Sequence, residues 1–188
     1  MKIAILCLLL PFSALAAIQK PQEVVQDIFA KASAPEIANS AAKQSEVNGA
    51  VDFSALAKGA LGKNFKTTPA KDFEWFRATL QEIIARTVYP KAPEFLNGVK
   101  INYEAVKENG NGATVKSTVQ NKADLTDVEY RLQKGSDGSW RVVDVSISGI
   151  SWVDSIRDQV SDVLKKKKWQ GLKDAMSRRL ADLKAGKA

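Results

Sequence analysis

The middle of the chain alternates apolar and polar residues, which is the pattern of half-buried β-strands. Four runs show it, and turns rich in Asn, Asp and Gly join neighbouring runs closely enough for an antiparallel meander. We therefore predict a curved four-stranded antiparallel sheet with one apolar face. Its apolar positions are Val99, Ile101, Tyr103 and Ala105, then Ala113, Val115 and Val119, then Val128, Tyr130 and Leu132, and finally Val143, Val145 and Ile147.

Helical periodicity lies on both sides of these strands. Four helices are predicted before them: residues 21–32, a weakly patterned stretch at 36–48, residues 53–61 ending at Gly62, and residues 69–88 with Thr68 as N-cap. The apolar face of the sheet needs cover, and the helices supply it. The last helix contributes Trp169, Leu172, Met176, Leu180 and Leu183. The fold class is therefore α+β, a single domain with its helices packed on one face of the sheet.

The passage from the last strand to the last helix is the most distinctive stretch. Gly149 follows the strand, where an abrupt change of direction predicts a positive φ angle. Ser151 and Asp154 have the spacing of a helix N-cap. Asp144 lies on the opposite strand face from Val145, and we expect it to lock the turn, with Arg157 as a candidate ion-pair partner.

The N-terminus has the features of a secretory signal peptide. Lys2 precedes an apolar run at residues 3–10, and Ala14-Leu15-Ala16 forms a small-x-small cleavage site. The run is too short to span a bilayer. We predict cleavage after Ala16, which leaves residues 17–188 as one exported domain without cysteine or histidine. This composition disfavours most zinc sites and Ser-His or Cys-His nucleophile pairs.

The net charge of +7 becomes +6 when Lys2 leaves with the signal peptide. A basic exported protein is attracted to anionic headgroups or acidic partners, whereas nucleic acid is disfavoured because aromatics are not interleaved with the basic residues. The lysine run at 165–168 has two interpretations, a solvated helix end or a binding patch. Trp75, opposite the apolar face of its helix, is either covered by another helix or a docking contact.

Two blocks of the sequence carry a family resemblance. Residues 140–157 read W-x-V-x-D-V-x-I-x-G-I-S-x-V-x-x-x-R, and residues 52–65 read D-F-x(7)-L-G-x-x-F. Both resemble the MlaC family of periplasmic phospholipid-shuttle proteins, which more often has Trp or Tyr in place of Phe65. The chain departs from the family at residues 165–169, where four lysines and a tryptophan stand in the region of a glycine-containing break before the last helix.

The resemblance implies an apolar slot between sheet and helices that holds acyl chains. It also implies a monomeric carrier that moves phospholipid between an outer-membrane lipoprotein–porin complex and an inner-membrane ABC transporter bearing an MCE-domain protein. No reaction, metal or cofactor is implied, and phospholipid is the cargo. The candidate slot residues are Phe53, Leu61, Phe73, Phe76, Leu80, Tyr103, Tyr130, Val145, Ile147 and Trp152.

Two other functions are compatible with the sequence. A small isomerase or hydrolase could use Asp144 with Tyr103 and Tyr130 as acid–base groups, although Asp144 is predicted on the wrong face of its strand for that cavity. A non-lipid periplasmic adaptor would instead have a filled core with no room for an acyl chain.

Overall fold

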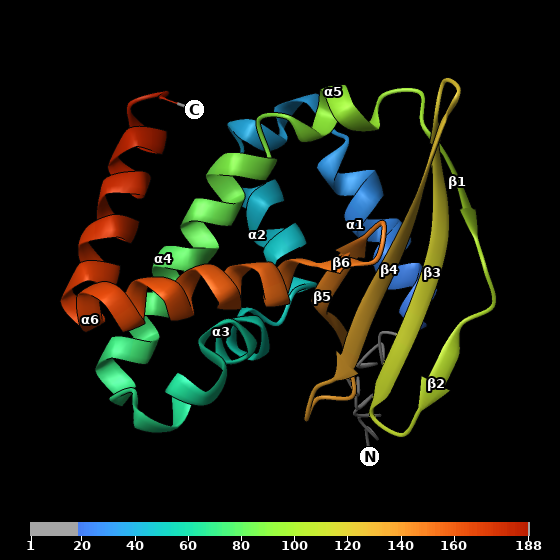
Figure 1. Cartoon of the computed structure of the whole chain (residues 1–188). Helices are drawn as coiled ribbons and strands as arrows, with labels where there is room; N and C mark the ends of the chain where they lie inside the picture. The colour runs from blue at the N-terminus through green and yellow to red at the C-terminus, as the bar shows by residue number, and fades with distance from the viewer. Residues whose placement is uncertain (1–18, 188) are drawn as a thin grey trace, which may run out of the picture.

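The computed structural model describes residues 19–187, and there the sheet forms one side of the molecule while the helices lie on the other (Figure 1). The predicted signal peptide at residues 1–16 lies outside the described residues. The fold class is α+β, as predicted. No helix among residues 19–187 combines the length and apolar character needed to cross a membrane.

The sheet has six antiparallel strands instead of the predicted four. The strand order is β1-β3-β4-β5-β6, and β2 also pairs with β3. The strands are β1 (Lys100–Tyr103), β2 (Lys107–Asn109), β3 (Gly112–Asn121), β4 (Asp124–Lys134), β5 (Trp140–Ile147) and β6 (Ile150–Ser151).

One of the two additional strands arises because the first predicted strand is interrupted. Tyr103 pairs with Ser117 and Lys107 with Thr114, so the edge strand holds one residue more than the stretch of β3 opposite it. Such an extra residue reverses the side-chain alternation. Ala105, predicted on the apolar face, is therefore exposed, and the neighbouring Val106 packs against the core instead.

A second irregularity, in β5, also shifts the inward-facing residues. Arg131 pairs with Asp144 and Leu132 with Val142, which leaves Val143 as the bulged residue. Val143 is therefore absent from the core at the sheet, contrary to the prediction. Val142 takes the inward position, and Val145 packs against the same core from the other side of the bulge.

The helices largely follow the prediction. Helices α1 and α3 have the predicted bounds, while the weakly patterned stretch divides at Ser40 into a 3-10 turn and α2. The N-cap of α4 is Pro69, because the Thr68 hydroxyl donates to the Asn64 carbonyl at 2.8 Å. The helical elements are α1 (Pro21–Ala32), η1 (Pro35–Ala38), α2 (Ala41–Gly49), α3 (Phe53–Leu61), η2 (Gly62–Thr67), α4 (Ala70–Val88), α5 (Ala92–Leu96) and α6 (Trp152–Lys184).

The core consists of separate clusters. One lies between the sheet and α1, where Val24 and Val25 pack on Val115, Tyr130 and Leu132. A second joins α3, α4 and α6, and a small third contains Ile37, Val47 and Tyr89. The C-terminal apolar residues predicted to cover the sheet cover α4 instead, since Trp169, Leu172 and Met176 belong to the second cluster.

Asp144 fixes the start of α6. Its side chain is 1% exposed and accepts hydrogen bonds from the Ser151 hydroxyl at 2.6 Å and the Val153 N–H at 3.0 Å. Its ion-pair partner is Arg131 from β4, whereas Arg157, the partner considered from the sequence, pairs with Asp154 at 2.9 Å. Asp144 thereby joins two strands to the first turn of the helix.

The turn just before α6 has the predicted geometry. Gly149 has φ +79°, and Ser148 beside it has φ 49°. Two consecutive positive φ angles between Ile147 and Ile150, which pair as neighbours in β5 and β6, are the geometry of a type I′ hairpin turn. The Ser151 hydroxyl then caps α6 by accepting the Asp154 N–H at 3.0 Å.

Helix α6 is broken in its middle. Lys168 has φ 58° and ψ −170°, a conformation that is essentially restricted to glycine, and the helix turns sharply there (Figure 1). A Cβ at Gly171 would lie 2.2 Å from Cβ of Lys167, so glycine is required just after the break. A break before the last helix, which the resemblance to the MlaC family implies, is thus present, with lysine at the strained position.

We predict that Asp144→Asn lowers the free energy of unfolding by about 2 kcal/mol, the size of hydrogen bonds to a charged group. Burial alone raises the pKa of Asp144, but the bonds from Ser151, Val153 N–H and Arg131 outweigh it and hold that pKa below its ordinary 3.8. The charged carboxylate therefore stabilises the fold above pH 3.8, and this contribution is lost as the pH falls through the lowered value.

Urea unfolding at a series of pH values measures this effect. The matched control is Asp162→Asn, since the Asp162 side chain is 73% exposed and its ion pair with Lys166 is long, at 3.9 Å. Equal unfolding midpoints for wild type and Asp144→Asn at neutral pH would show that the carboxylate does not anchor α6.

We predict that Lys168→Gly raises the free energy of unfolding by about 1 kcal/mol, because it removes the strain of a non-glycine residue at this φ and ψ. Lys165→Gly is the control: it lies in helical backbone of α6, where glycine costs about 1 kcal/mol. Thermal unfolding of both variants measures the difference, and the explanation of the break fails if the two substitutions destabilise equally.

Candidate functional site

An apolar groove lies between α4 and the two halves of α6. It encloses about 370 Å³, near the lower end of the range for ligand pockets, roughly 300–1,000 Å³. Twelve of its fifteen lining residues are apolar: Phe76, Leu80, Ile83, Ile84, Val88, Trp152, Ile156, Val160, Val163, Leu172, Ala175 and Met176. The three others are Thr87, Gln159 and Arg179.

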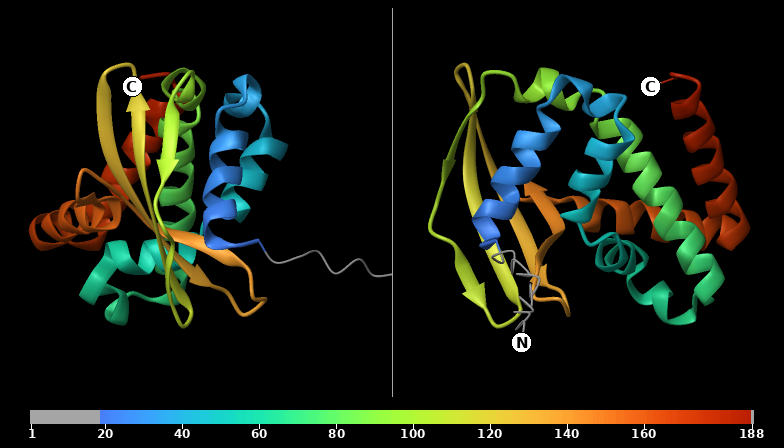
Figure 2. Two further views of the ribbon diagram at one scale, coloured as in Figure 1. Left: turned by 90° about the vertical axis from the view of Figure 1, so that its right-hand side faces the viewer. Right: turned by 180° about the vertical axis from the view of Figure 1, so that it is seen from behind.

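The break in α6 creates this groove. The first half of α6 leaves the sheet and crosses α4, and the second half turns back alongside α4 (Figures 1 and 2). Phe76 of α4 reaches Trp169 just beyond the break, with ring centroids 6.4 Å apart. The two halves of α6 and α4 therefore make three walls, each with apolar residues at helical spacing.

The groove walls contain little charge. Arg179 is the only ionisable residue in the lining. The Thr87 hydroxyl donates to the Ile83 carbonyl at 2.8 Å, so the polar group of Thr87 is already paired within α4. A surface of this composition favours binding of the hydrocarbon part of a ligand, because contact between two apolar surfaces removes both from water.

Large apolar side chains are exposed at and just before the start of α6. Trp152 lines the groove and is 38% exposed. Next to it in the chain, the β5–β6 hairpin carries Ile147, which is 37% exposed, and Ile150, which is 65% exposed. The residues just before α6 and the start of α6 itself thus expose three large apolar side chains, of which Trp152 also lines the groove.

The structure divides the ten candidate slot residues among three places. Phe76, Leu80 and Trp152 line the groove. Leu61 and Phe73 are buried in the helical cluster that forms its floor, and Phe53 is buried at the start of α3. The remaining four belong to the sheet: Tyr103, Tyr130 and Val145 in the sheet cluster, and Ile147 exposed on β5. Their role in lipid binding stays a prediction.

The tyrosines on the sheet lie in an apolar environment. Burial raises the pKa of Tyr130 to about 12 and also raises the pKa of Tyr103. The nearby Ser117 hydroxyl partly offsets this rise in the pKa of Tyr130. Neither the Ser117 Oγ nor the Tyr130 hydroxyl oxygen has a hydrogen-bond partner within residues 19–187. Edge-on contact with Phe29 of α1, at 5.9 Å between centroids, covers Tyr130 from the other side.

This arrangement does not favour the acid–base chemistry considered from the sequence. Asp144 pairs with Arg131 across β5 and β4, while the adjacent Val145 pairs with Tyr130. Successive strand residues point to opposite faces, so the Asp144 carboxylate and the Tyr130 hydroxyl lie on different sides of the sheet. The carboxylate is also fully engaged at the start of α6.

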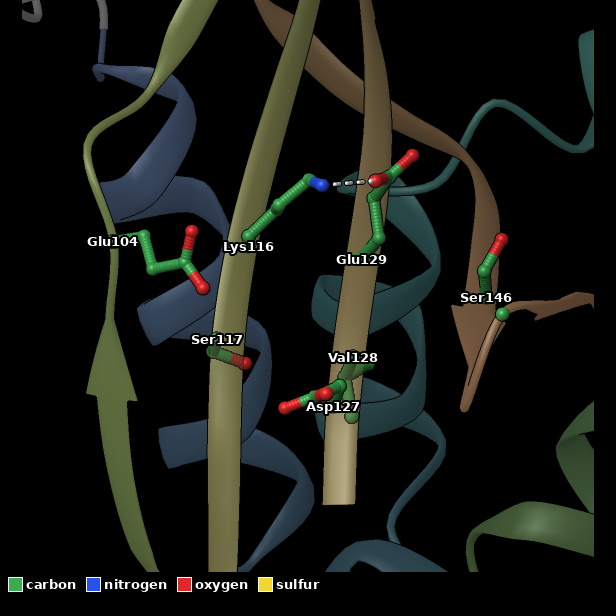
Figure 3. A pocket seen from close by; sticks show the side chains of 8 residues that line it. Glu104, Lys116, Ser117, Asp127, Val128, Glu129 and Ser146 are labelled. Carbon is green, nitrogen blue, oxygen red and sulfur yellow. Dashed lines mark ion pairs between the residues drawn. The ribbon is translucent and has the colours of Figure 1, made fainter. Parts of the chain in front are cut away.

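A second hollow lies on the outer face of the sheet and is polar. Figure 3 shows Lys116 and Glu129 pointing toward one another across β3 and β4, and their charged atoms are 3.3 Å apart. Glu104 and Asp127 also line this hollow. Its acidic and polar lining contrasts with the groove between the helices.

The sequence alone did not reveal the third wall of the groove. Leu172 and Met176 were recognised as apolar positions but assigned to the sheet, and Arg179 was not singled out. A turn at a lysine has no local sequence signal, because a positive φ is expected at glycine. Gly171 was the one available indication, three residues after the break.

Comparisons with known proteins agree with the observed fold. A model of the MlaC protein family matches residues 19–178. A phospholipid-binding protein from Ralstonia solanacearum, solved in complex with a phospholipid, shares the fold with a TM-score of 0.71 and 22% sequence identity, over 86% of this chain and 95% of that one. A search of curated proteins found no match. Because the family model spans most of its length, this chain belongs to the MlaC family.

Proposed function

We propose that this protein is a phospholipid carrier, a binding and transport protein that performs no chemical step. The apolar groove between α4 and α6 carries the proposal, because it offers hydrocarbon contacts on three sides and a single ionisable group. Family membership and the fold shared with a phospholipid-binding protein of Ralstonia solanacearum support the choice of ligand.

The physical demand on such a carrier is large. Each methylene moved out of water gains about 0.8 kcal/mol, so two acyl chains with roughly thirty methylenes represent over 20 kcal/mol. A phospholipid therefore cannot cross water alone at a useful rate. A carrier must shelter the chains in transit and release them only at an acceptor.

The groove must widen to hold a whole lipid, since about 370 Å³ lies near the lower limit for a ligand pocket. The break at Lys168 supplies a place for this change. The second half of α6 is a separate helical segment beyond the break, so a small rotation there would separate Leu172 and Met176 from Phe76 and Leu80 without disturbing the sheet.

We further propose the route of transport that membership of this family implies. The signal at residues 1–16 would direct export and be cleaved, leaving residues 17–188 in the periplasm as a single lipid-binding domain. The carrier would then exchange phospholipid, as a monomer, with an outer-membrane lipoprotein–porin complex and an inner-membrane ABC transporter bearing an MCE-domain protein. This exchange would serve outer-membrane lipid asymmetry.

We expect the protein purified from cells under non-denaturing conditions to carry phospholipid in stoichiometric amount. Native mass spectrometry and analysis of a solvent extract measure the bound lipid. Protein that is folded yet lipid-free, and that takes up no phospholipid from added vesicles, would contradict the proposal.

We expect the walls of the groove, more than any charge, to decide lipid loading. Arg179→Gln should change the free energy of lipid binding by no more than about 1 kcal/mol, the usual size for an exposed charge contact. Leu80→Trp fills the groove and Leu80→Ala leaves a void, so both should change loading far more.

Lipid loading per folded protein, measured for each variant beside its melting temperature, separates binding from stability. If Arg179→Gln abolished lipid loading while both Leu80 variants kept it, the site would recognise the lipid headgroup and not the acyl chains. That result would overturn this model of the groove.

A further inference from the structure

Positive charge is strongly segregated in this molecule. Residues 99–151, which contain the whole sheet, hold seven basic and seven acidic residues and are neutral overall. By contrast, residues 58–71 hold four lysines and residues 165–168 four more, with no acidic residue in either segment. The excess charge of the protein therefore belongs largely to two short segments of the helical part.

The fold brings these two segments to the same end of the molecule. Residues 58–71 run from α3 through η2 into the first turn of α4, and residues 165–168 form the corner of α6 (Figures 1 and 2). Lys173, one turn past the corner, binds Asp72 at the start of α4 with 2.6 Å between Nζ and Oδ1. Across the same junction Phe76 packs on Trp169.

The lysines of this end are available to a partner. All eight are exposed: Lys58, Lys63, Lys66, Lys71, Lys165, Lys166, Lys167 and Lys168. Within residues 19–187, only Lys166 of these eight has a carboxylate within 4 Å, that of Asp162 at 3.9 Å. Asp72, the nearest acidic residue in the chain to Lys71, is already bound to Lys173. Lys165, Lys166 and Lys167 belong to the last turn of the first half of α6, and Lys168 lies at the corner itself.

We propose that this lysine-rich end docks the protein on the surface of an anionic membrane. The eight basic residues are all lysine, a compact and strongly hydrated charge, whereas recognition of protein carboxylates favours the planar fork of arginine. Each lysine close to an anionic bilayer contributes about 1 kcal/mol, so several together bind without a fixed geometry. The inference goes beyond the proposed carrier function, and it rests on the charge distribution whether or not the groove holds lipid.

Cosedimentation with vesicles tests the proposal, using phosphatidylcholine mixed with phosphatidylglycerol and, in parallel, phosphatidylcholine alone. The wild type should bind the anionic vesicles at low ionic strength and detach as salt is added. A variant with Lys63, Lys66, Lys165 and Lys167 each changed to Gln should bind at least about 100-fold more weakly, from roughly fivefold per lysine.

A second quadruple variant controls for net charge. Lys91, Lys100, Lys107 and Lys122 are exposed and lie at α5 and along the sheet, and changing each to Gln removes the same charge. This control should bind anionic vesicles nearly as the wild type does. The proposal is overturned if the wild type binds neither vesicle at low salt, as expected for a protein that docks on an acidic protein instead. Equal weakening of both quadruple variants, which would indicate an effect of net charge alone, also overturns it.

Lipid loading of the same variants keeps this test separate from the carrier proposal. The variant at the lysine-rich end should load phospholipid normally and fail to bind anionic vesicles. Leu80→Trp should bind anionic vesicles normally and load less phospholipid. A wild-type protein that binds anionic vesicles but carries no phospholipid would contradict the carrier proposal and still support the docking surface.

Discussion

The Asp144 carboxylate lies between the sheet and the first turn of α6, and the position of the groove depends on how it is held. A buried charge is costly unless its hydrogen-bonding capacity is satisfied. Here the Ser151 hydroxyl, the Val153 N–H and Arg131 satisfy it together. These bonds require α6 to leave the sheet in one direction. Since α6 supplies two of the three groove walls, the direction in which it starts determines where the groove forms.

The separation of the core into clusters has a consequence for function. The sheet and α1 share one cluster, while α3, α4 and α6 share another. Interiors are close-packed, so movement inside a cluster is resisted by many contacts. Movement of the second half of α6 about Lys168 would break its contacts with α4, the Lys173–Asp72 ion pair among them, and leave the cluster at the sheet unchanged. The sheet could therefore remain rigid while the groove changes width, which the carrier function proposed above requires.

Much of the fold follows from local sequence signals. Helix α1 begins at Pro21, α3 ends just before Gly62, and the hairpin before α6 turns at Gly149, each as its residue type predicts. At these positions the type of a single residue determines the local backbone conformation. The alternation in β3 and β4 likewise placed Val115 and Leu132 in the core.

The sequence was less informative where long-range packing determines the backbone conformation. The extra residue near Ala105 and the bulge at Val143 depend on register with the neighbouring strand, which leaves no mark in the residues themselves. For the site, two wall residues of α4 and Trp152 of α6 were identified from periodicity. The wall from the second half of α6 was missed, because its cause is the conformation of a single lysine.

That lysine connects the two surfaces described above. A residue held at φ 58° and ψ −170° persists only where its surroundings impose the conformation, and such strain is concentrated at functional sites. At Lys168 the strain turns α6 back on α4, which closes the third side of the groove, and it also exposes the lysine run at a corner of the molecule. Glycine would form the same turn with less strain but would carry no charge. Lysine at this position is therefore consistent with a corner that serves both tasks, forming the groove and presenting positive charge outside it.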